Sequence, residues 1–329
     1  MRLIDIYKPI KTELKRVEDT LAERLGKRGL GVISEINHHL LSAKGKRLRP
    51  ALAILSARAS SKRQSSVSMR RLVRLASALE LTHMASLVHD DVIDESKLRH
   101  DRPTVNSKWG YDVSVAVGDY LYSEAFSLIS DCGSPDIIAC MSSAIKAMCE
   151  GELTQVCERE NLELLKHDYI VIVKKKTAAL FAASCHAGTI LANEDPDVRN
   201  SLKRYGLNFG IAFQMRDDCM DLIGEVGTLG KDPGADFKMG ELTLPALELL
   251  SQEKNKAHIV SLLKQKGDTG AFREIRQRFI DSGAFVRAEE EISSYVKKAK
   301  NSLNALKDSC FKDNLFALAD YVGEKSKRP

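Results

Sequence analysis

The chain has 329 residues, of which 43% are apolar and 29% are charged, so it can bury a large core beneath an ordinary soluble surface. Its 50 Lys and Arg residues and 45 Asp and Glu residues give a net charge of only +5, and the two signs are interspersed. A nucleic-acid-binding protein concentrates its positive charge in a patch or tail. We therefore expect no nucleic-acid partner.

The N-terminal residues 1–16 alternate apolar and charged side chains and lack the apolar core of a secretion signal. No run approaches the roughly 20 uninterrupted apolar residues of a membrane span, so we expect no integral membrane segment. The seven cysteines include no Cys-x-x-Cys pair, which favours free, buried thiols in a reducing compartment. These features predict a cytoplasmic protein.

Prolines are sparse, and the long intervals between them predict extended helices in residues 51–98, 104–131, 136–192 and 246–323. Apolar residues recur at helical spacing within them, as at Leu72, Leu75 and Leu79, whereas alternating β-type runs are scarce. Loops are expected at 132–135, 193–197 and 224–240. The pattern predicts one all-α domain spanning residues 1–329.

Two clusters of aspartates share the spacing Asp-Asp-x-x-Asp and follow apolar residues. They are Asp90, Asp91 and Asp94, and then Asp217, Asp218 and Asp221. Residues four apart lie on one face of a helix, so each cluster crowds carboxylates together, which is costly without a cation. Magnesium accepts such hard oxygen ligands and is typically shared with substrate phosphates. One cluster alone could be a solvated helix face, but two with the same spacing favour a clamp for a magnesium-bound diphosphate.

Basic residues supply the counterpart. The segment 45–50 (GKRLRP) carries Lys46 and Arg49 in a compact loop suited to grip a diphosphate. His83 lies seven residues before Asp90, two helical turns away on the same face, although an isolated histidine there is as readily a core residue. Weaker candidates are Lys176, Thr177 and Lys231.

Taken in order, these motifs resemble the trans-isoprenyl diphosphate synthase family, also called polyprenyl synthases, over nearly the whole chain. The segments that carry the resemblance are 45–50 (GKRLRP), 81–94 (LTHMASLVHDDVID), 103–106 (PTVN), 117–121 (VGDYL), 150–153 (EGEL), 176–181 (KTAALF), 213–221 (FQMRDDCMD), 230–236 (GKDPGAD) and 243–245 (TLP). A single Asp-Asp-x-x-Asp motif is weak evidence, whereas this ordered series is specific.

The resemblance implies a role for each matching residue. Magnesium, two or three ions per active site, would be held by Asp90, Asp91 and Asp94 on one side and by Asp217, Asp218 and Asp221 on the other. The diphosphate of the allylic substrate, such as farnesyl diphosphate, would contact Arg99, Lys176, Thr177 and Lys231. Isopentenyl diphosphate would bind Lys46, Arg49 and His83, with His100 beside them, and Gln214 would lie near the reacting allyl group.

The family is built of antiparallel helices around a deep central cavity and usually acts as a homodimer. Its members ionise the allylic diphosphate with the help of metal ions and cations, and the double bond of isopentenyl diphosphate then attacks the carbocation. The resemblance therefore implies a prenyltransferase of the isoprenoid synthase fold that uses isopentenyl diphosphate repeatedly and supplies, for example, a quinone side chain.

Three residues depart from the family pattern. His100 and Asp101 stand where an arginine and a glycine are usual, and Glu241 replaces a lysine near the allylic site. These changes keep open a second hypothesis, a non-catalytic subunit of a heteromeric synthase. A third, a terpene cyclase, is disfavoured by Lys46, Arg49 and His83, because a cyclase binds no second diphosphate.

Product length is expected to depend on the residues one turn before Asp90, which are Ala85 and Ser86. Their small side chains would leave the cavity open and favour a long product of about octaprenyl length. The alternatives are that they merely allow close helix packing, or that a deeper residue limits the product to farnesyl or geranylgeranyl length. The candidates for that deeper residue are Phe126, Met141 and Met148.

Overall fold

The computed structural model describes residues 2–26, 31–43, 45–61, 67–99, 101–192, 195–224, 234–252 and 256–324. Nearly all of them lie in helices, and the described part holds only one pair of two-residue strands. The expected all-α fold class is therefore confirmed. No helix in these ranges is both long and apolar enough to cross a membrane.

The chain divides into two compact units, each assembled from three segments. Unit 1 comprises Met1–Ala144, Leu180–Gly206 and Asn301–Leu318, and unit 2 comprises Ile145–Ala179, Leu207–Lys300 and Ala319–Pro329. The single domain expected over residues 1–329 stays a prediction.

Unit 1 begins with the short helices α1 (Leu3–Ile6) and η1 (Lys8–Ile10). It continues with α2 (Lys11–Gly26), α3 (Val32–Ser42), α4 (Leu48–Ser60), α5 (Met69–Ile93), the hairpin β1 (Leu98–Arg99) and β2 (Arg102–Pro103), α6 (Val105–Trp109) and α7 (Tyr111–Ser130). It also holds the first part of α8 (Pro135–Cys157), most of α10 (Ala179–Ala192), the first part of α11 (Pro196–Ile223), η3 (Leu303–Ala305) and most of α17 (Cys310–Glu324).

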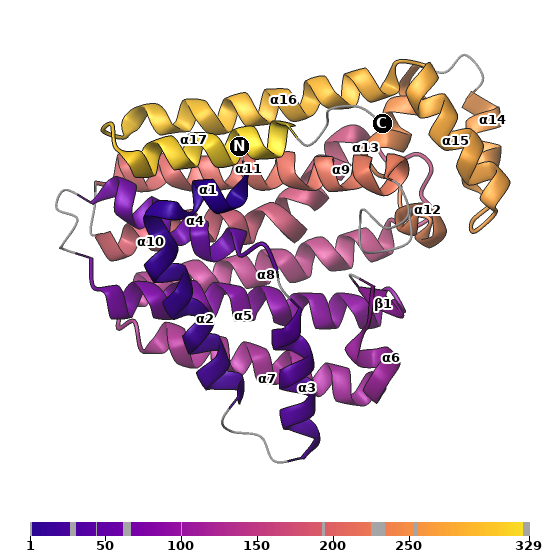
Figure 1. Ribbon diagram of the computed structural model, residues 1–329. Coiled ribbons are helices and arrows are strands. Elements are labelled where there is room, and N and C mark those ends of the chain that lie inside the picture. The colour runs from indigo at the N-terminus through magenta and orange to yellow at the C-terminus, as the bar shows by residue number, and fades with distance from the viewer. Residues whose placement is uncertain are drawn as a thin grey trace. The chain divides into compact units, whose positions relative to one another are not determined.

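The centre of unit 1 is helix α5, which lies side by side with α7 (Figure 1). The hydroxyl of Ser68 caps α5 by accepting the backbone N–H of Arg71, and Leu72, Leu75 and Leu79 are fully buried. Arg71, near the start of α5, donates to the carbonyl of Cys132 just after α7 (2.7 Å). The two helices are therefore antiparallel.

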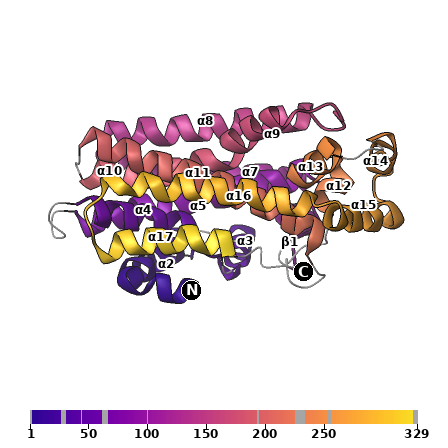
Figure 2. The ribbon, with the colours of Figure 1, turned by 90° about the horizontal axis from the view of Figure 1, so that it is seen from above.

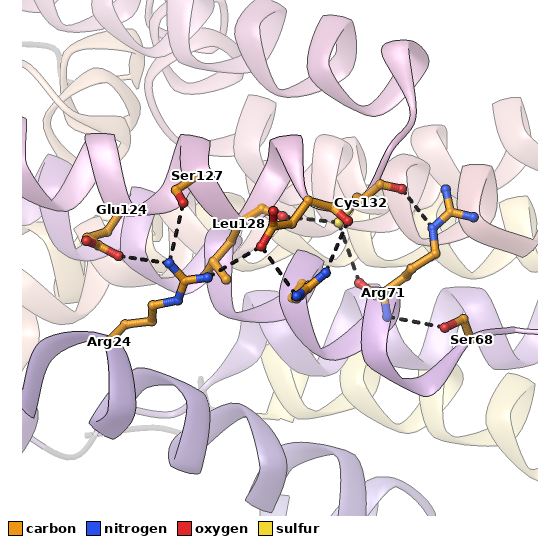
Figure 3. Close-up of polar contacts among 9 residues, drawn as sticks. Arg24, Ser68, Arg71, Glu124, Ser127, Leu128 and Cys132 are labelled. Carbon is orange, nitrogen blue, oxygen red and sulfur yellow. Dashed lines mark hydrogen bonds and ion pairs between the residues drawn. The ribbon is translucent and has the colours of Figure 1, made fainter. Parts of the chain in front are cut away.

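Helix α2 is tied to α7 by one arginine (Figure 3). The Nη1 atom of Arg24 lies 3.4 Å from Oε2 of Glu124 and 3.4 Å from Oγ of Ser127. These contacts and the Arg71 bond fix the far end of the α5–α7 pair, opposite the aspartate cluster.

Unit 2 holds the rest of α8, α11 and α17 together with α9 (Lys166–Val173), the π-helical η2 (Lys174–Ala178), α12 (Ala235–Met239), α13 (Leu244–Gln252), α14 (Lys256–Leu263), α15 (Thr269–Asp281) and most of α16 (Ala284–Ser302). Helices α13, α14 and α15 pack together at one end of this unit (Figure 2). The buried carboxylate of Glu248 on α13 pairs with Lys166 (2.9 Å) and Arg287 (3.3 Å), which ties α9 and α16 to α13.

The predicted long helices are broken at positions that proline spacing does not reveal. Gly110 has φ 91° and separates α6 from α7, and Gly283, with φ 76°, separates α15 from α16. Both values lie in the left-handed region that glycine enters without steric cost. All seven cysteines are free of disulfides, as expected, but Cys149, Cys157 and Cys310 are exposed, so the prediction of buried thiols is wrong for these three.

Candidate active site

The first aspartate cluster lies at the C-terminal end of α5. Asp94 is the C-cap residue and its N–H donates to the carbonyl of Asp90 (2.8 Å), so these two carboxylates emerge from the same turn. Both are half-buried, whereas Asp91 is buried. The cluster therefore presents Asp90 and Asp94 at the helix end, as the sequence predicts, with Asp91 set behind them.

Asp91 is held by the hairpin that follows α5. Both Nε and Nη2 of Arg99 lie 2.8 Å from Oδ1 of Asp91. Burial disfavours the charged guanidinium, but the nearby carboxylates of Asp91, Asp90 and Asp94 raise the pKa of Arg99 above its usual value. The backbone carbonyl of Asp91 also accepts Nδ2 of Asn106 (3.0 Å). The sequence-predicted cation Arg99 thus lies directly against the first cluster.

Arg49 lies in the same unit with its guanidinium 4.3 Å from the ring centroid of Phe181, a cation–π contact. Burial lowers the pKa of Arg49 to about 10, opposed by Glu80 and Asp90. Among the described residues, Nε of Arg49 has no hydrogen-bond partner although it is buried. A buried donor without a partner is costly, so this atom is placed to receive an acceptor from outside the protein.

His83 lies near these arginines. Its burial and the positive charges of Arg49, Arg99 and Arg47 depress its pKa well below the usual value, so the imidazole is neutral at pH 7. Lys46 is exposed, and its backbone carbonyl accepts the hydroxyl of Tyr7 (2.9 Å). Unit 1 therefore gathers Arg49, His83 and Arg99 around the end of α5, with Lys46 at the surface of the basic loop.

Arg47 is a site residue that sequence reasoning missed. It has φ 52° and is bound by Glu18 (2.5 Å) and by the buried Glu80 (2.6 Å). Burial opposes its charge, but these two carboxylates raise the pKa of Arg47 above its usual value. Its charge is thus compensated, and its role is to fix the loop between Lys46 and Arg49. The sequence alone does not distinguish the role of Arg47 from those of Lys46 and Arg49. The acids that bind Arg47 lie 29 and 33 residues away along the chain.

The second aspartate cluster lies on α11 in unit 2. Asp217 is exposed, whereas Asp218 and Asp221 are buried. Oδ1 of Asp218 accepts Nε2 of Gln214 (2.7 Å) and Oδ2 accepts the hydroxyl of Tyr169 (2.6 Å). Asp221 is held by the start of α12, since its Oδ2 accepts the N–H of Asp236 (3.2 Å).

Tyr169 is a second residue that the sequence pattern does not single out, because it lies among the apolar residues of α9. Burial and the neighbouring Asp218 raise the pKa of Tyr169 well above its usual value, so the phenol keeps its proton and remains a donor. The sequence carries only a chemical signal for the role of Tyr169. A tyrosine on a buried helix face needs a partner for its hydroxyl.

Lys176 and Thr177 lie on η2, the π-helical segment that continues α9. Gly151 on α8 packs against this segment so closely that a Cβ there would lie 2.3 Å from the backbone nitrogen of Lys176. The Nζ atom of Lys176 pairs with Oε2 of Glu152 (2.6 Å), and the hydroxyl of Thr177 donates to Oε1 of Gln214 (2.8 Å). Such π-helical insertions are frequent at functional sites.

The structure describes two of the three residues that depart from the family pattern, Glu241 and Asp101. Glu241 is paired with Arg159 (3.1 Å between Nε and Oε1) and also accepts Nε2 of Gln155. Its negative charge is therefore compensated within unit 2. Asp101 adopts φ 58°, the left-handed conformation that glycine favours. His100 and Lys231 lie outside the described residues.

The proposed chain-length residues differ in their surroundings. Ala85 is fully buried, and Ser86 is half-buried with its hydroxyl bound to the carbonyl of His83 (2.9 Å). Phe126 lies on the exposed side of α7, which leaves Met141 and Met148 as buried candidates for a deeper limit. A surface cavity of about 370 Å³ in unit 1, lined by α3 residues with Arg102 and Lys108, contains none of the predicted site residues.

The residues of both clusters fit magnesium by the chemistry of their donors, which are all carboxylate oxygens. Within the described ranges no three His, Cys, Asp or Glu side chains converge as a preformed metal site. Magnesium commonly binds one or two carboxylates and completes its octahedron with water and substrate phosphates.

Comparisons with known proteins find relatives over nearly the whole chain. The family model described as polyprenyl synthetase matches residues 31–278. The chain is 33% identical to heptaprenyl diphosphate synthase component 2 of Geobacillus stearothermophilus, over 99% of each chain, and 30% identical to octaprenyl diphosphate synthase of Escherichia coli, over 99% of this chain and 100% of the relative.

A solved structure extends the likeness to the fold. The polyprenyl synthase of Caulobacter crescentus, complexed with calcium and isoprenyl diphosphate, matches with a TM-score of 0.91 and 32% identity, covering 98% of this chain and 97% of that one. The motifs, the all-α fold and these matches together place the chain in the polyprenyl synthetase family, with the isoprenoid synthase fold.

Proposed function

We propose that this chain is a magnesium-dependent prenyltransferase that condenses isopentenyl diphosphate repeatedly onto an allylic diphosphate such as farnesyl diphosphate. The observation that carries the proposal is the gathering of cations and carboxylates at the end of α5. Arg99 pairs with Asp91 there, and Arg49, influenced by Asp90, keeps a buried Nε without a partner among the described residues. A diphosphate supplies the acceptors that such a donor lacks.

In this proposal, Arg49, Lys46 and His83 bind the diphosphate of isopentenyl diphosphate. The neutral imidazole of His83 donates a hydrogen bond without adding a positive charge. His100, outside the described residues, is assigned to the same diphosphate by its place in the family motif.

The allylic diphosphate is assigned to Arg99, Lys176, Thr177 and Lys231. Magnesium would be held by the two sets of aspartates, Asp90, Asp91 and Asp94, and Asp217, Asp218 and Asp221. When bound, the metal neutralises charge that builds on the departing diphosphate. The relative of known structure, crystallised with calcium and isoprenyl diphosphate, supports a cation-and-diphosphate site.

The chain's own residues then have two tasks. Arg99 and Lys176 stabilise the leaving diphosphate as the allylic C–O bond breaks, and Arg49 holds the second substrate still. The double bond of isopentenyl diphosphate attacks the allylic carbocation, forming one C–C bond, and a proton is lost to the released diphosphate. The product is one isoprene unit longer.

The test is a comparison of Michaelis constants in Arg49→Gln and in the control Arg16→Gln, which changes an exposed residue of α2. Loss of a charge-assisted bond predicts a KM for isopentenyl diphosphate about 10- to 100-fold higher in Arg49→Gln. The KM for the allylic substrate should change little, and Arg16→Gln should match the wild type. An unchanged KM in Arg49→Gln would remove this residue from the substrate site.

For product length we propose about eight isoprene units, on the ground that Ala85 and Ser86 are small. The two relatives named above carry heptaprenyl and octaprenyl in their names, which supports a long product. Replacing Ser86, the half-buried member of the pair, with Phe should shorten the main product by at least two units. Chromatography of the products decides this.

We further propose that the chain acts as a cytoplasmic homodimer whose contact includes α7. Three large apolar side chains recur along one face of that helix and are exposed, Tyr111 (52%), Val115 (47%) and Phe126 (40%). Exposed apolar stripes of this kind mark protein interfaces. Light scattering of the wild type and of Val115→Glu should give a dimer and a monomer, respectively.

A second candidate is a subunit of a heteromeric synthase. It is supported by the name of one relative, which is called component 2 of its enzyme. The two proposals differ in one result. The homodimer by itself elongates an allylic diphosphate with isopentenyl diphosphate, whereas a heteromeric subunit is inactive until its partner is added.

A further inference from the structure

Tyr169 on α9 and Asp218 on α11 form a buried hydrogen bond within unit 2. The phenol oxygen lies 2.6 Å from Oδ2 of Asp218, and the two residues are only 4% and 5% exposed. A bond to an ionised acceptor at this distance is stronger than one between neutral groups. Tyr169 therefore donates to a carboxylate of the second aspartate cluster and is not merely packed in the core.

The other carboxylate oxygen is held as well. Gln214 lies one turn before Asp218 on α11 and donates its Nε2 to Oδ1 (2.7 Å). The amide oxygen of Gln214 in turn accepts the hydroxyl of Thr177 (2.8 Å). Because a hydroxyl donor faces the amide oxygen, the amide nitrogen is turned towards Asp218.

These bonds fix the orientation of the carboxylate. With a donor on each oxygen, rotation of the buried Asp218 carboxylate breaks at least one short hydrogen bond. Each carboxylate oxygen carries two lone pairs, so an oxygen that accepts one of these hydrogen bonds can also ligate a cation. The arrangement holds the carboxylate in one orientation.

A comparison within the chain shows what a structural tyrosine does here. Tyr205 is fully buried, and its hydroxyl donates to the backbone carbonyl of Leu315 at 2.7 Å. Such a bond satisfies the hydroxyl and stabilises packing, but it orients no charged group. The hydroxyl of Tyr169 instead donates to a residue of the second aspartate cluster.

We propose that Tyr169 is a positioning residue that aligns Asp218 to bind magnesium diphosphate. The inference rests on the proposed function, since it takes Asp218 as a ligand of the metal–diphosphate complex. Groups that orient metal-binding carboxylates commonly change metal affinity by about 10- to 100-fold when they are removed. Tyr169 should fall in this range.

The experiment titrates the full-length protein with inorganic diphosphate in the presence of magnesium and measures the Kd by calorimetry. Tyr169→Phe should bind about tenfold more weakly than the wild type or worse. The matched control Tyr205→Phe, which also loses one buried phenol bond, should bind within about twofold of the wild type. Thermal melting of both variants shows whether weaker diphosphate binding is caused by loss of folding.

A Kd in Tyr169→Phe within about twofold of the wild-type value would overturn the inference. If Tyr169→Phe does not fold, Gln214→Met decides instead, because it removes the other donor to Asp218 and keeps the side-chain volume. Unchanged diphosphate binding in that variant overturns the proposal that hydrogen-bond donors align Asp218 for magnesium diphosphate, and weakened binding supports it. A wild-type protein that binds no magnesium diphosphate contradicts the proposed function and this inference together, whereas normal wild-type binding with an unchanged variant contradicts the inference alone.

Discussion

The guanidinium of Arg99 approaches Asp91 through two nitrogens, Nε and Nη2, each 2.8 Å from the same carboxylate oxygen. The hairpin that carries Arg99 therefore returns onto the end of α5 and compensates the most buried carboxylate of the first cluster. Asp90 and Asp94 remain at the helix end. The Arg99–Asp91 ion pair therefore both holds the hairpin against the end of α5 and sets the charge of the proposed diphosphate site.

Replacing Arg99 with Ala should cost both stability and activity. The buried Asp91 would lose its partner, and because Arg99 itself is partly exposed we expect a loss of about 1–3 kcal/mol in the free energy of unfolding. Catalysis should fall at least about 100-fold, since the proposed stabilisation of the leaving diphosphate by Arg99 is removed. Urea unfolding and steady-state kinetics measure these two effects. A variant with normal kcat would exclude Arg99 from the site.

His83 should make the protein less stable in mild acid. Its folded-state pKa is depressed, so between that value and the ordinary value near 6.5 the unfolded chain binds more protons than the folded one. Stability is therefore lost as the pH falls below about 6.5. His83→Gln should reduce this slope by up to about 1.4 kcal/mol per pH unit, whereas the exposed His167→Gln should leave it unchanged. Equal slopes in all three proteins would contradict the assignment.

Gly151 should not tolerate even alanine. A Cβ there would lie 2.3 Å from the backbone nitrogen of Lys176, and a backbone cannot yield as a flexible side chain can. Gly151→Ala should destabilise the protein by about 1–3 kcal/mol and displace the segment that carries Lys176 and Thr177. The control is Gly323→Ala on α17, where the nearest atoms would be 3.8 Å away. It should be neutral or stabilising by up to about 1 kcal/mol in thermal unfolding.

Glu241→Lys restores the residue type usual in the family but should lower stability here. The new lysine would face Arg159, which now pairs with Glu241, and would lose the bond from Gln155. We expect a loss of about 1–3 kcal/mol, because the pair is mostly buried. The double variant Arg159→Glu with Glu241→Lys should recover part of it in a denaturant titration. Increased stability of the single variant would show that the pair contributes nothing.

Asp101 should accept glycine but not a β-branched residue. With φ 58°, this position costs an L-residue such as valine about 1–2 kcal/mol, whereas glycine adopts the conformation freely. Asp101→Gly should therefore melt near the wild-type temperature and Asp101→Val clearly below it. Equal melting of the two variants would contradict the hairpin conformation.

The helical fold and both aspartate clusters could be predicted because they depend on local spacing. Asp90 and Asp94 share a turn as four-residue spacing requires, and Leu72, Leu75 and Leu79 are buried as their periodicity indicates. The helix breaks were missed because they lie at glycines such as Gly110, and the expectation relied on proline alone.

Other features of the site could not be predicted, since they depend on contacts between distant segments. The bond from Tyr169 to Asp218 spans 49 residues, and the bonds of Glu241 to Arg159 and Gln155 span 82 and 86. The π-helical turn at Lys174–Ala178 likewise has no local signal and is held by Gly151. Which residues pair across such long separations in sequence depends on the folded structure and not on the local sequence.

The most direct test of the proposed activity uses the purified chain alone, with magnesium, farnesyl diphosphate and labelled isopentenyl diphosphate, and separates the products by chromatography. The account predicts a magnesium-dependent ladder of elongated diphosphates ending near eight units. No incorporation of label by the well-folded wild-type chain would contradict it and would favour a subunit that needs a partner.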